Sequence, residues 1–343
     1  MNFTPVLIIT LNRREHLQRC IESLKKNKYA KDTELYIGLD YPPNEKYMDG
    51  YKDVVSYLEK GIHGFKNVVI LKQKENKGPF LNFVDLQNLA YEKYDRFIYT
   101  EDDNEFSSNY LEYMNKALDR YELEENILAV SGYSYPINTE KFSGNVFLCD
   151  SYFSALGYGM WKNKEKHMRE YLNRVYFEDL YRNRNYMGKL QKTSKNQYSN
   201  MVKGMLGYTP DIFQRGCIRE VDLTFALYMQ AFQMKVVFPV ISKVRNWGYD
   251  GSGVNCNQVE FADNQNINHR NYRFDMQKID TDEEFNEIIE EKKLSLDDIN
   301  RLLNTFFQID SKEYWKVKIA YQLSRILGLS ACRKLIGNKE LFE

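Results

Sequence analysis

The first 130 residues alternate short apolar runs with stretches in which apolar residues recur every three or four positions. The short runs predict strands, and the recurring positions predict helices with one apolar face. The expected strands lie at 6–9, 35–39, 68–71 and 97–99, and the expected helices lie at 17–24, at 47–60 and after Pro79. Strands that alternate with helices in this order predict a parallel sheet covered on both faces, which is an α/β fold.

The regular alternation ends near residue 130. Apolar runs at 127–130, 146–148 and 236–238 predict further strands, and residues 221–232 predict a helix. Residues 182–203 are basic, rich in Asn and poor in aliphatic side chains, so we interpret them as a mobile loop or an exposed helix.

The sequence changes character again near residue 259. An acidic stretch at 280–291 precedes two helical segments, and the second segment, 314–336, carries basic residues among apolar ones. Packing on the main domain or on a partner subunit is the favoured role for this segment, and docking on a membrane surface is the alternative. We therefore predict an α/β domain over residues 1–258, in two parts that meet near residue 130, followed by a C-terminal helical extension over 259–343.

The charges of the chain balance, with 48 Lys and Arg against 48 Asp and Glu in 343 residues. A protein held to nucleic acid by bulk electrostatics needs a basic excess, so this class is excluded. The five cysteines are odd in number and widely spaced, which disfavours a disulfide framework or a structural zinc site and indicates a reducing compartment. The N-terminus has no basic and apolar leader, and no apolar stretch approaches the roughly 20 residues that span a bilayer, so we expect a soluble, cytoplasmic protein.

Three consecutive acidic residues, Glu101, Asp102 and Asp103, follow the strand predicted at 97–99. Three carboxylates in a row repel one another and resist burial unless a cation or hydrogen-bond donors neutralise them. A divalent ion, Mg²⁺ or Mn²⁺, fits one or two of these carboxylates together with substrate phosphates. On an extended strand, Glu101 and Asp103 share one side and Asp102 takes the other. A solvated acidic turn or helix cap is the alternative, but ligands bind at the carboxyl ends of strands in such sheets, which favours the metal site.

The segment 101–106, taken together with 110–113, resembles the DxD-type metal site of glycosyltransferases with the GT-A fold. Within that fold it is most similar to the branch of N-acetylglucosaminyltransferase I and to bacterial family 2-like sugar transferases. Further segments that resemble the family are 10–13, Asp40, 75–78 and 246–253. The resemblance covers residues 4–256 and implies a Rossmann-like, mixed but mostly parallel sheet flanked by helices. It also implies that residues 1–130 bind the nucleotide-sugar and that residues 131–258 bind the acceptor.

The resemblance implies roles for the acidic triplet. Asp103 would hold Mn²⁺ or Mg²⁺ on the diphosphate of the donor, Asp102 would bind the ribose hydroxyls, and Glu101 would lie at the edge of the sugar or ribose.

The other donor-site residues implied by the resemblance are Thr10, Asn12, Arg13, Asp40, Lys77 and Gly78. Arg13 would bind the base or a phosphate, and the alternative is a surface Arg that opens a helix. Asp40 would accept a hydrogen bond from the uracil, and the alternative is a turn residue before Pro42 and Pro43.

An inverting transferase also needs a base that deprotonates the acceptor hydroxyl. Asp222, at the start of a predicted helix, is the candidate, and Glu220 is the fallback. The alternative for Asp222 is a carboxylate that only stabilises the positive end of the helix.

Four residues are implied on the sugar and acceptor side: Tyr158, Trp161, Asp250 and Ser252. Tyr158 and Trp161 would stack on a pyranose face or, equally, pack in the core. Asp250 and Ser252 belong to a Gly-rich loop that is typical of a flexible lid or of a simple turn.

These observations favour a metal-dependent, inverting hexosyl- or N-acetylhexosaminyltransferase that uses a UDP-sugar. Its acceptor would be a glycan, polysaccharide or lipid-linked saccharide, and its role would be bacterial polysaccharide or glycan biosynthesis. A nucleotidyltransferase is one alternative, although segment 10–13 lacks the Gly-rich loop of that class. A non-catalytic sugar- or nucleotide-binding protein is the other. Peripheral contact with the inner membrane face through the C-terminal helices and a homo-oligomer stay open.

Overall fold

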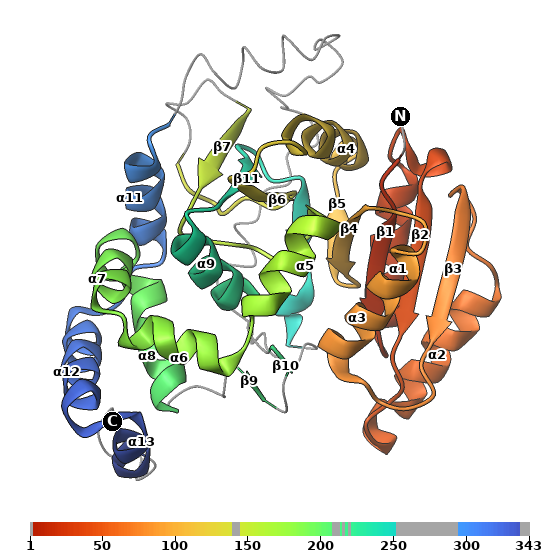
Figure 1. The fold of residues 1–343 in the computed structure, drawn as a ribbon. Coiled ribbons are helices and arrows are strands. Elements are labelled where there is room, and N and C mark those ends of the chain that lie inside the picture. The colour runs from red at the N-terminus through yellow and green to blue at the C-terminus, as the bar shows by residue number, and fades with distance from the viewer. Residues whose placement is uncertain are drawn as a thin grey trace. The chain divides into compact units, whose positions relative to one another are not determined.

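A computed structural model describes residues 3–138, 145–207, 213–214, 217–218, 221–251 and 294–336 of the chain (Figure 1). The chain forms two compact units, and each unit is built from separate stretches of sequence. The first unit comprises Met1–Phe147, Ser154–Glu165 and Val236–Lys293, and the second comprises Leu148–Phe153, Lys166–Lys235 and Leu294–Glu343.

Four parallel strands form one half of an eight-stranded sheet. They are β1 (Val6–Thr10), β2 (Glu34–Leu39), β3 (Asn67–Lys72) and β4 (Arg96–Glu101), in the spatial order β3-β2-β1-β4. The intervening helices are α1 (Arg14–Lys25), α2 (Met48–Glu59) and α3 (Gly78–Ala90), with short 3-10 turns at Ala30–Asp32 and Glu45–Tyr47. Every residue of β1 and β2 is buried, as expected for central strands of a parallel sheet. Because the strands are parallel, their carboxyl ends meet at one edge of the sheet.

The other half of the sheet is mixed. Strand β8 (Tyr158–Trp161) runs antiparallel between β4 and β6 (Ile127–Ser131), and β11 (Lys235–Pro239) and β7 (Val146–Cys149) complete the order. Gly159 in β8 lets α4 (Tyr110–Tyr121) pack closely, because a Cβ there would lie 2.9 Å from Leu118 Cδ1. The strands and helices expected in the first 130 residues are all present, and the prediction of a mostly parallel α/β sheet flanked by helices is confirmed.

A small antiparallel ribbon lies beside the acidic residues. It pairs β5 (Asn104–Phe106) with β12 (Val244–Asn246), two segments far apart in sequence. Strand β12 leads into the 3-10 turn η3 (Gly248–Asp250). The ribbon therefore brings residues 244–250 to the end of β4.

The second unit is mainly helical. Its helices are α6 (Arg174–Arg182), α7 (Arg184–Thr193), α8 (Lys195–Leu206), α9 (Val221–Phe232), α11 (Leu296–Phe306), α12 (Ser311–Leu327) and α13 (Leu329–Ile336). Helix α5 (Lys162–Tyr171) spans the boundary between the units, and β9 (Phe213–Gln214) pairs with β10 (Cys217–Ile218). None of the described helices is long and apolar enough to cross a membrane.

The segment expected as a loop or exposed helix at 182–203 is helical, and α8 is largely buried. Tyrosine and methionine side chains supply the apolar contacts that the missing aliphatic residues would make: Tyr186, Met187, Tyr198, Met201 and Met205 are buried. Side-chain caps at Asn183 and Ser194 set the starts of α7 and α8.

The predicted helix at 314–336 is two helices. Gly328 ends α12 with a φ of +85°, a conformation that favours glycine, and α13 begins at the next residue. Helix α12 packs against α8 and α13. The acidic stretch at 280–291 and the domain boundary predicted near 258 lie outside the described residues.

Candidate active site

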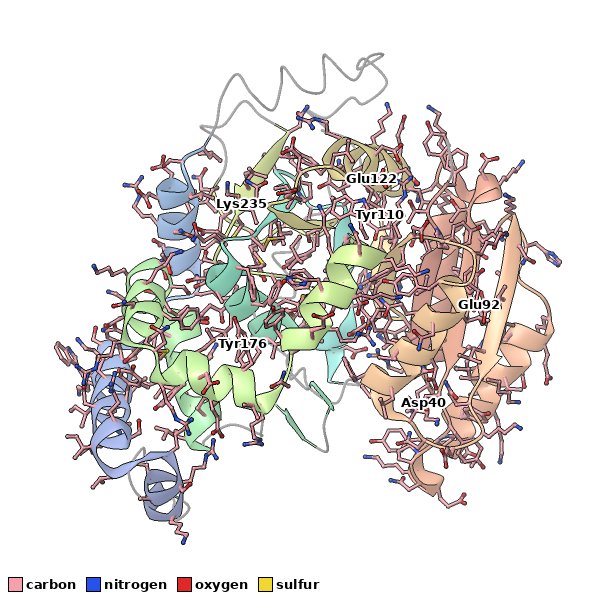
Figure 2. All side chains as sticks on the ribbon, in the orientation of Figure 1. Asp40, Glu92, Tyr110, Glu122, Tyr176 and Lys235 are labelled. Atoms are coloured by element: carbon pink, nitrogen blue, oxygen red, sulfur yellow. The ribbon has the colours of Figure 1, made fainter. Side chains whose placement is uncertain are left out.

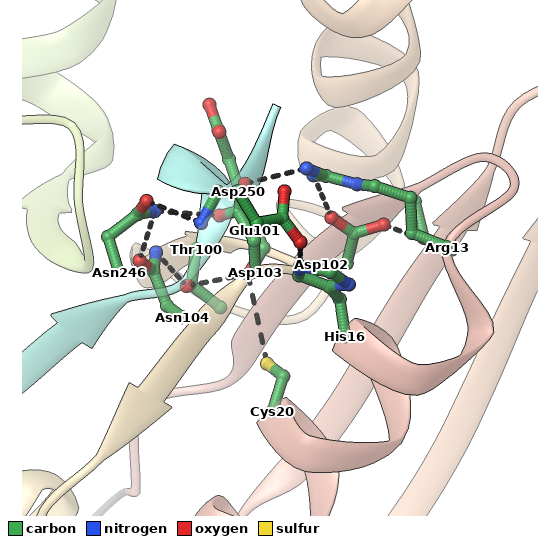
Figure 3. A network of polar contacts seen from close by, with 12 residues as sticks. Arg13, His16, Cys20, Thr100, Glu101, Asp102, Asp103, Asn104, Asn246 and Asp250 are labelled. Carbon is green, nitrogen blue, oxygen red and sulfur yellow. Dashed lines mark hydrogen bonds and ion pairs between the residues drawn. The ribbon is translucent and has the colours of Figure 1, made fainter. Parts of the chain in front are cut away.

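Two neighbouring parallel strands, β1 and β4, end beside one buried carboxylate. Thr10, the last residue of β1, donates from Oγ1 to Asp102 Oδ2 at 2.7 Å. Arg13 lies just before α1, and it pairs with Asp102 through Nη2 and with Asp103 Oδ2 through Nη1 at 2.9 Å (Figure 3). Both carboxylates therefore contact the same guanidinium.

This geometry corrects the expected arrangement of the triplet. Asp102 and Asp103 were expected on opposite sides of a strand, but β4 ends at Glu101 and the next two residues form a turn before β5. The alternation of side chains holds only along an extended strand, so it ends with β4. The turn directs both aspartates towards Arg13.

The two carboxylates are buried, and the Arg13 side chain that pairs with them is partly buried. Asp102 is 3% exposed and Asp103 is 6% exposed. Burial raises the pKa of Asp102, and the Arg13 guanidinium opposes that shift. Burial alone would lower the pKa of Arg13, but the two carboxylates outweigh it and raise the pKa. The end of β4 is thus a place where two carboxylates stabilise a positive charge.

The last residue of β12 and the turn that follows it contact the other side of Asp103. Asn246 Nδ2 donates to Asp103 Oδ1 at 2.8 Å and to Asn104 Oδ1 at 2.9 Å, and the Trp247 backbone N–H donates to the Asp103 carbonyl at 2.8 Å. Gly248 lies so close that a Cβ on it would overlap Asp103 Oδ2. Only glycine fits at this position while Asp103 keeps its place.

Trp247 anchors that loop to its surroundings. Its Nε1 donates to Glu105 Oε2 at 2.8 Å. The guanidinium carbons of Arg19 and Arg245 lie 4.4 and 4.1 Å from the centre of the indole ring, which are cation–π distances. The indole therefore ties β5, α1 and β12 together.

Asp250 and Glu101 lie at the rim of this cluster. Asp250 Oδ2 is 3.1 Å from His16 Nε2, a distance that makes an ion pair when the imidazole is protonated, although the two groups are not aligned as a hydrogen bond. Glu101 accepts from the Tyr99 hydroxyl at 3.3 Å through Oε1. Both side chains are more exposed than Asp102 and Asp103.

A second cluster forms around Asp40, which follows β2 at the same edge of the sheet (Figure 2). Its carboxylate accepts from the backbone N–H groups of Lys77 and Gly78, both at 2.8 Å, and from Asn76 Nδ2 at 3.2 Å. Burial raises the pKa of Asp40, and these hydrogen bonds oppose the shift. Asp40 therefore fixes the loop that starts α3, and the structure brings together three of the predicted residues: Asp40, Lys77 and Gly78.

The remaining predicted residues lie elsewhere or are not described. Tyr158 and Trp161 are buried in β8, where Tyr158 packs against Phe97 and Tyr99. Asn12 precedes α1, and its carbonyl packs against Gly50 of α2. Asp222 lies in the first turn of α9, in the second unit. Glu220 and Ser252 lie outside the described residues.

Asp102 and Asp103 suit a metal ion whose other ligands come from the substrate and from water. The described residues contain no group of three or more His, Cys, Asp or Glu side chains arranged to hold a metal ion. Asp103 nevertheless directs Oδ2 at a cationic group, which shows that a positive charge is stable there. Magnesium and manganese sites often use one or two carboxylates and complete their shell with substrate phosphates and water, and Asp103 with Asp102 fits such a site.

Four residues that contact Asp103 or Asp250 were not among the predicted site residues: Asn246, Trp247, Gly248 and His16. Asn246 and Gly248 lie in the segment 246–253, which resembles the family in sequence, but their contact with Asp103 depends on the pairing of β5 with β12. Hydrogen-bonding residues directly before a Gly-rich turn are the signal that could have found them. Nothing in the sequence around His16 indicates a functional site, because single histidines are common in helices.

Residues 6–187, more than half of the chain, match a family described as "Glycosyl transferase family 2". No curated protein sequence matches the chain. Among solved structures, residues 1–349 of TarS from S. aureus are 12% identical, with 95% of this chain and 81% of that chain covered and a TM-score of 0.42.

The matches to two other solved structures cover smaller parts of those chains. A second structure of S. aureus TarS is 15% identical over 38% of this chain and 21% of that chain, with a TM-score of 0.28. The mannosyltransferase PcManGT from Pyrobaculum calidifontis, in complex with GDP-Man and Mn²⁺, is 11% identical over 48% of this chain and 46% of that chain, with a TM-score of 0.32. The match thus spans about a fifth of that TarS chain and less than half of the mannosyltransferase.

Proposed function

Since the chain belongs to glycosyl transferase family 2, as the resemblance in its sequence predicted, we propose that it transfers a sugar from a UDP-sugar to a glycan or lipid-linked saccharide. The observation that carries this proposal is the buried pair Asp102 and Asp103 at the carboxyl end of β4, where both meet a cation. The carboxyl ends of parallel strands are where open α/β sheets bind their ligands.

The donor would be held by its diphosphate and ribose. When the bond to the anomeric carbon breaks, negative charge grows on the departing nucleoside diphosphate. A divalent ion on Asp103, Mn²⁺ or Mg²⁺, would supply Lewis-acid stabilisation of that charge. Arg13, which pairs with Asp102 in the structure, would donate to phosphate oxygens when the donor is bound, and Asp102, oriented by Thr10, would accept from a ribose hydroxyl.

Two neighbouring groups keep Asp103 in position for this role. Asn246 occupies Oδ1, so Oδ2 is the oxygen directed at the cation. The Gly248 backbone limits rotation of the carboxylate from the other side. Such preorganisation lowers the cost of reorienting charged groups during the reaction.

Asp40 and the loop it fixes would line the base of the nucleotide. In this proposal the Asp40 carboxylate acts mainly through the loop at Lys77 and Gly78, since it already accepts hydrogen bonds from both. Asp222 is the proposed general base for an inverting reaction, with Glu220 as the alternative, and either would accept the proton of the acceptor hydroxyl.

The test is calorimetric titration of UDP with and without Mn²⁺. We expect wild-type protein to bind UDP more tightly with the metal and Asp103→Asn to lose this dependence. Asp95→Asn, which removes an exposed carboxylate, is the matched control and should behave like wild type. If the affinity of the wild type for UDP is the same with and without Mn²⁺, the proposed metal site is wrong. A panel of UDP- and GDP-sugars in the same assay identifies the donor.

A further inference from the structure

Helix α12 in the second unit has two faces of different character. Val317, Tyr321 and Ser324 are buried on one face. The opposite face carries Trp315 and Ile326, which are 59% and 79% exposed. Single exposed apolar residues are normal on a protein surface, so the question is whether these form a group.

The exposed apolar residues of α12 do form a stripe. Five of the ten most exposed large hydrophobic side chains of the described residues lie on this helix: Trp315, Ile319, Leu323, Ile326 and Leu327. The first four follow one another at spacings of four, four and three, which places them on one side of a helix. We call these four residues the α12 stripe.

Basic residues flank the α12 stripe. At about 100° per residue, Lys318 and Arg325 fall on one side of it and Lys316 falls on the other. Lys318 Nζ lies 4.5 Å from the Trp315 ring, so its aliphatic stem runs along the apolar surface. The acidic residue of the helix, Glu313, pairs with Lys203. The charge beside the stripe is therefore positive.

We propose that the α12 stripe docks on the surface of an anionic lipid bilayer, with α12 lying in the plane of the interface. An apolar face with Trp, flanked by Lys and Arg, is the pattern of helices that insert partway into lipid headgroups. Tryptophan is enriched at that depth, and the basic residues on either side meet anionic headgroups.

Charge favours the bilayer over a second copy of the chain. A symmetric contact between two α12 stripes places the same patch on both sides, so Lys318 and Arg325 of one copy would face equivalent cations of the other. Like charges across an interface oppose association. The proposal concerns the second unit and stands apart from the proposed chemistry at Asp103.

The experiment is flotation of the full chain with vesicles of phosphatidylcholine, alone or mixed in equal parts with phosphatidylglycerol. We expect binding to the anionic vesicles that weakens as salt is raised. A Trp315→Ala, Ile319→Ser, Ile326→Ser variant should lose roughly tenfold or more in affinity. A Lys316→Gln, Lys318→Gln, Arg325→Gln variant should lose the preference for anionic vesicles, by roughly fivefold per charge removed.

The control variant is Leu123→Ser with Val175→Ser, which removes two exposed apolar side chains outside α12 and should bind as wild type does. Trp315 fluorescence should shift to the blue on adding anionic vesicles, and Trp315→Phe should abolish the shift. Thermal unfolding and UDP binding of each variant show that it is folded, so loss of vesicle binding is separable from failure at the candidate active site.

Two results would overturn the proposal. One is equal recovery of wild type and the Trp315→Ala, Ile319→Ser, Ile326→Ser variant with anionic vesicles. The other is a wild-type protein that does not bind the vesicles and that light scattering shows to be a dimer, while the variant is a monomer. This would assign the α12 stripe to contact with a second copy of the chain.

Discussion

Arg13 Nη1 lies 2.9 Å from Asp103 Oδ2, and the same guanidinium also pairs with Asp102. One side chain at the start of α1 thus neutralises two adjacent carboxylates at the end of β4. The pairing joins two loops that are about 90 residues apart in the sequence. Arg13 and a divalent ion are therefore both cations that Asp103 could bind.

The first prediction concerns removal of that cation. Arg13→Met leaves two buried carboxylates side by side, and we expect a loss of about 3 kcal/mol of unfolding free energy, because a buried charge without its partner is costly. Mn²⁺ should restore part of the loss, since it supplies positive charge at Asp103. The measurement is denaturant unfolding with and without Mn²⁺.

The adjacent Arg14 provides the control for this experiment. It is exposed and bonds only weakly to Gln18, at 3.4 Å, so Arg14→Met should change little in either condition. An Arg13→Met protein as stable as wild type would show that the pairing contributes nothing.

The second prediction concerns the contact of Gly248 with Asp103. Gly248→Ala places a methyl group where Asp103 Oδ2 now lies, so the carboxylate must turn away. We expect metal-dependent UDP binding to weaken by roughly tenfold or more, as misplaced binding groups commonly do. Calorimetric titration of UDP in the presence of Mn²⁺ measures the effect.

Gly188→Ala is the control for Gly248→Ala, because it makes the same substitution far from Asp103 in the sequence. Gly188 lies in α7, and a Cβ added there would have no atom within 4 Å, so the Gly188→Ala protein should bind UDP normally and its helix should be more stable by about 0.5–1 kcal/mol. Unchanged UDP binding in Gly248→Ala would mean that Asp103 does not need its present orientation.

The third prediction tests the general base. Asp222→Asn should lower turnover by roughly 10²–10⁴-fold and leave UDP binding intact, because it removes a proton acceptor and no phosphate ligand. Steady-state rates with the donor found in the binding panel, compared with calorimetry, separate the two effects. Asp179→Asn, at an exposed position in α6, is the control. If Asp222→Asn turns over as fast as wild type, the general base is Glu220 or another carboxylate.

The fourth prediction concerns pH and Lys243, which precedes β12. Its side chain is 1% exposed, and burial lowers the pKa of Lys243 to about 7 from its ordinary value of 10.5. Below pH 7 both the folded and unfolded protein carry the charge, so the folded state bears the full cost of burying it. Between pH 7 and 10 the folded state releases the proton first, so this contribution makes stability rise with pH.

Replacing the amine should remove that rise. Lys243→Met should stabilise the protein at pH 6 by on the order of 3 kcal/mol, and the gain should shrink towards zero near pH 10. Thermal or denaturant unfolding of both proteins across this range measures the difference, with Lys74→Met, at an exposed position, as the control. A difference that is constant with pH would contradict the shifted pKa.

Local sequence pattern was enough to predict most of the sheet. The apolar runs match β1 to β4 closely, and Pro79 correctly indicated the start of α3. The pattern failed where the decisive interaction is distant. The turn at Asp102 and Asp103 depends on where β4 ends, and burial of α8 depends on helices more than 100 residues further along the chain.

The same limit applies to the candidate site. Carboxylates after a strand are visible in a sequence, so Asp102 and Asp103 could be found. The contact of Asn246 with Asp103 spans 143 residues and follows from the β5–β12 ribbon, which no local periodicity encodes. The role of Asp40 as the anchor of a loop was likewise hidden, because its partners are backbone N–H groups and carry no residue signature.

The β5–β12 ribbon has a consequence for biosynthesis. During translation the acidic turn leaves the ribosome long before residues 244–248, which supply the Asn246 amide and the close approach of Gly248. Strand β8, the antiparallel neighbour of β4, is also made later, after β5, α4, β6 and β7. The nascent chain therefore carries Asp103 without its final neighbours, and the site is complete only after β12 is synthesised and pairs with β5.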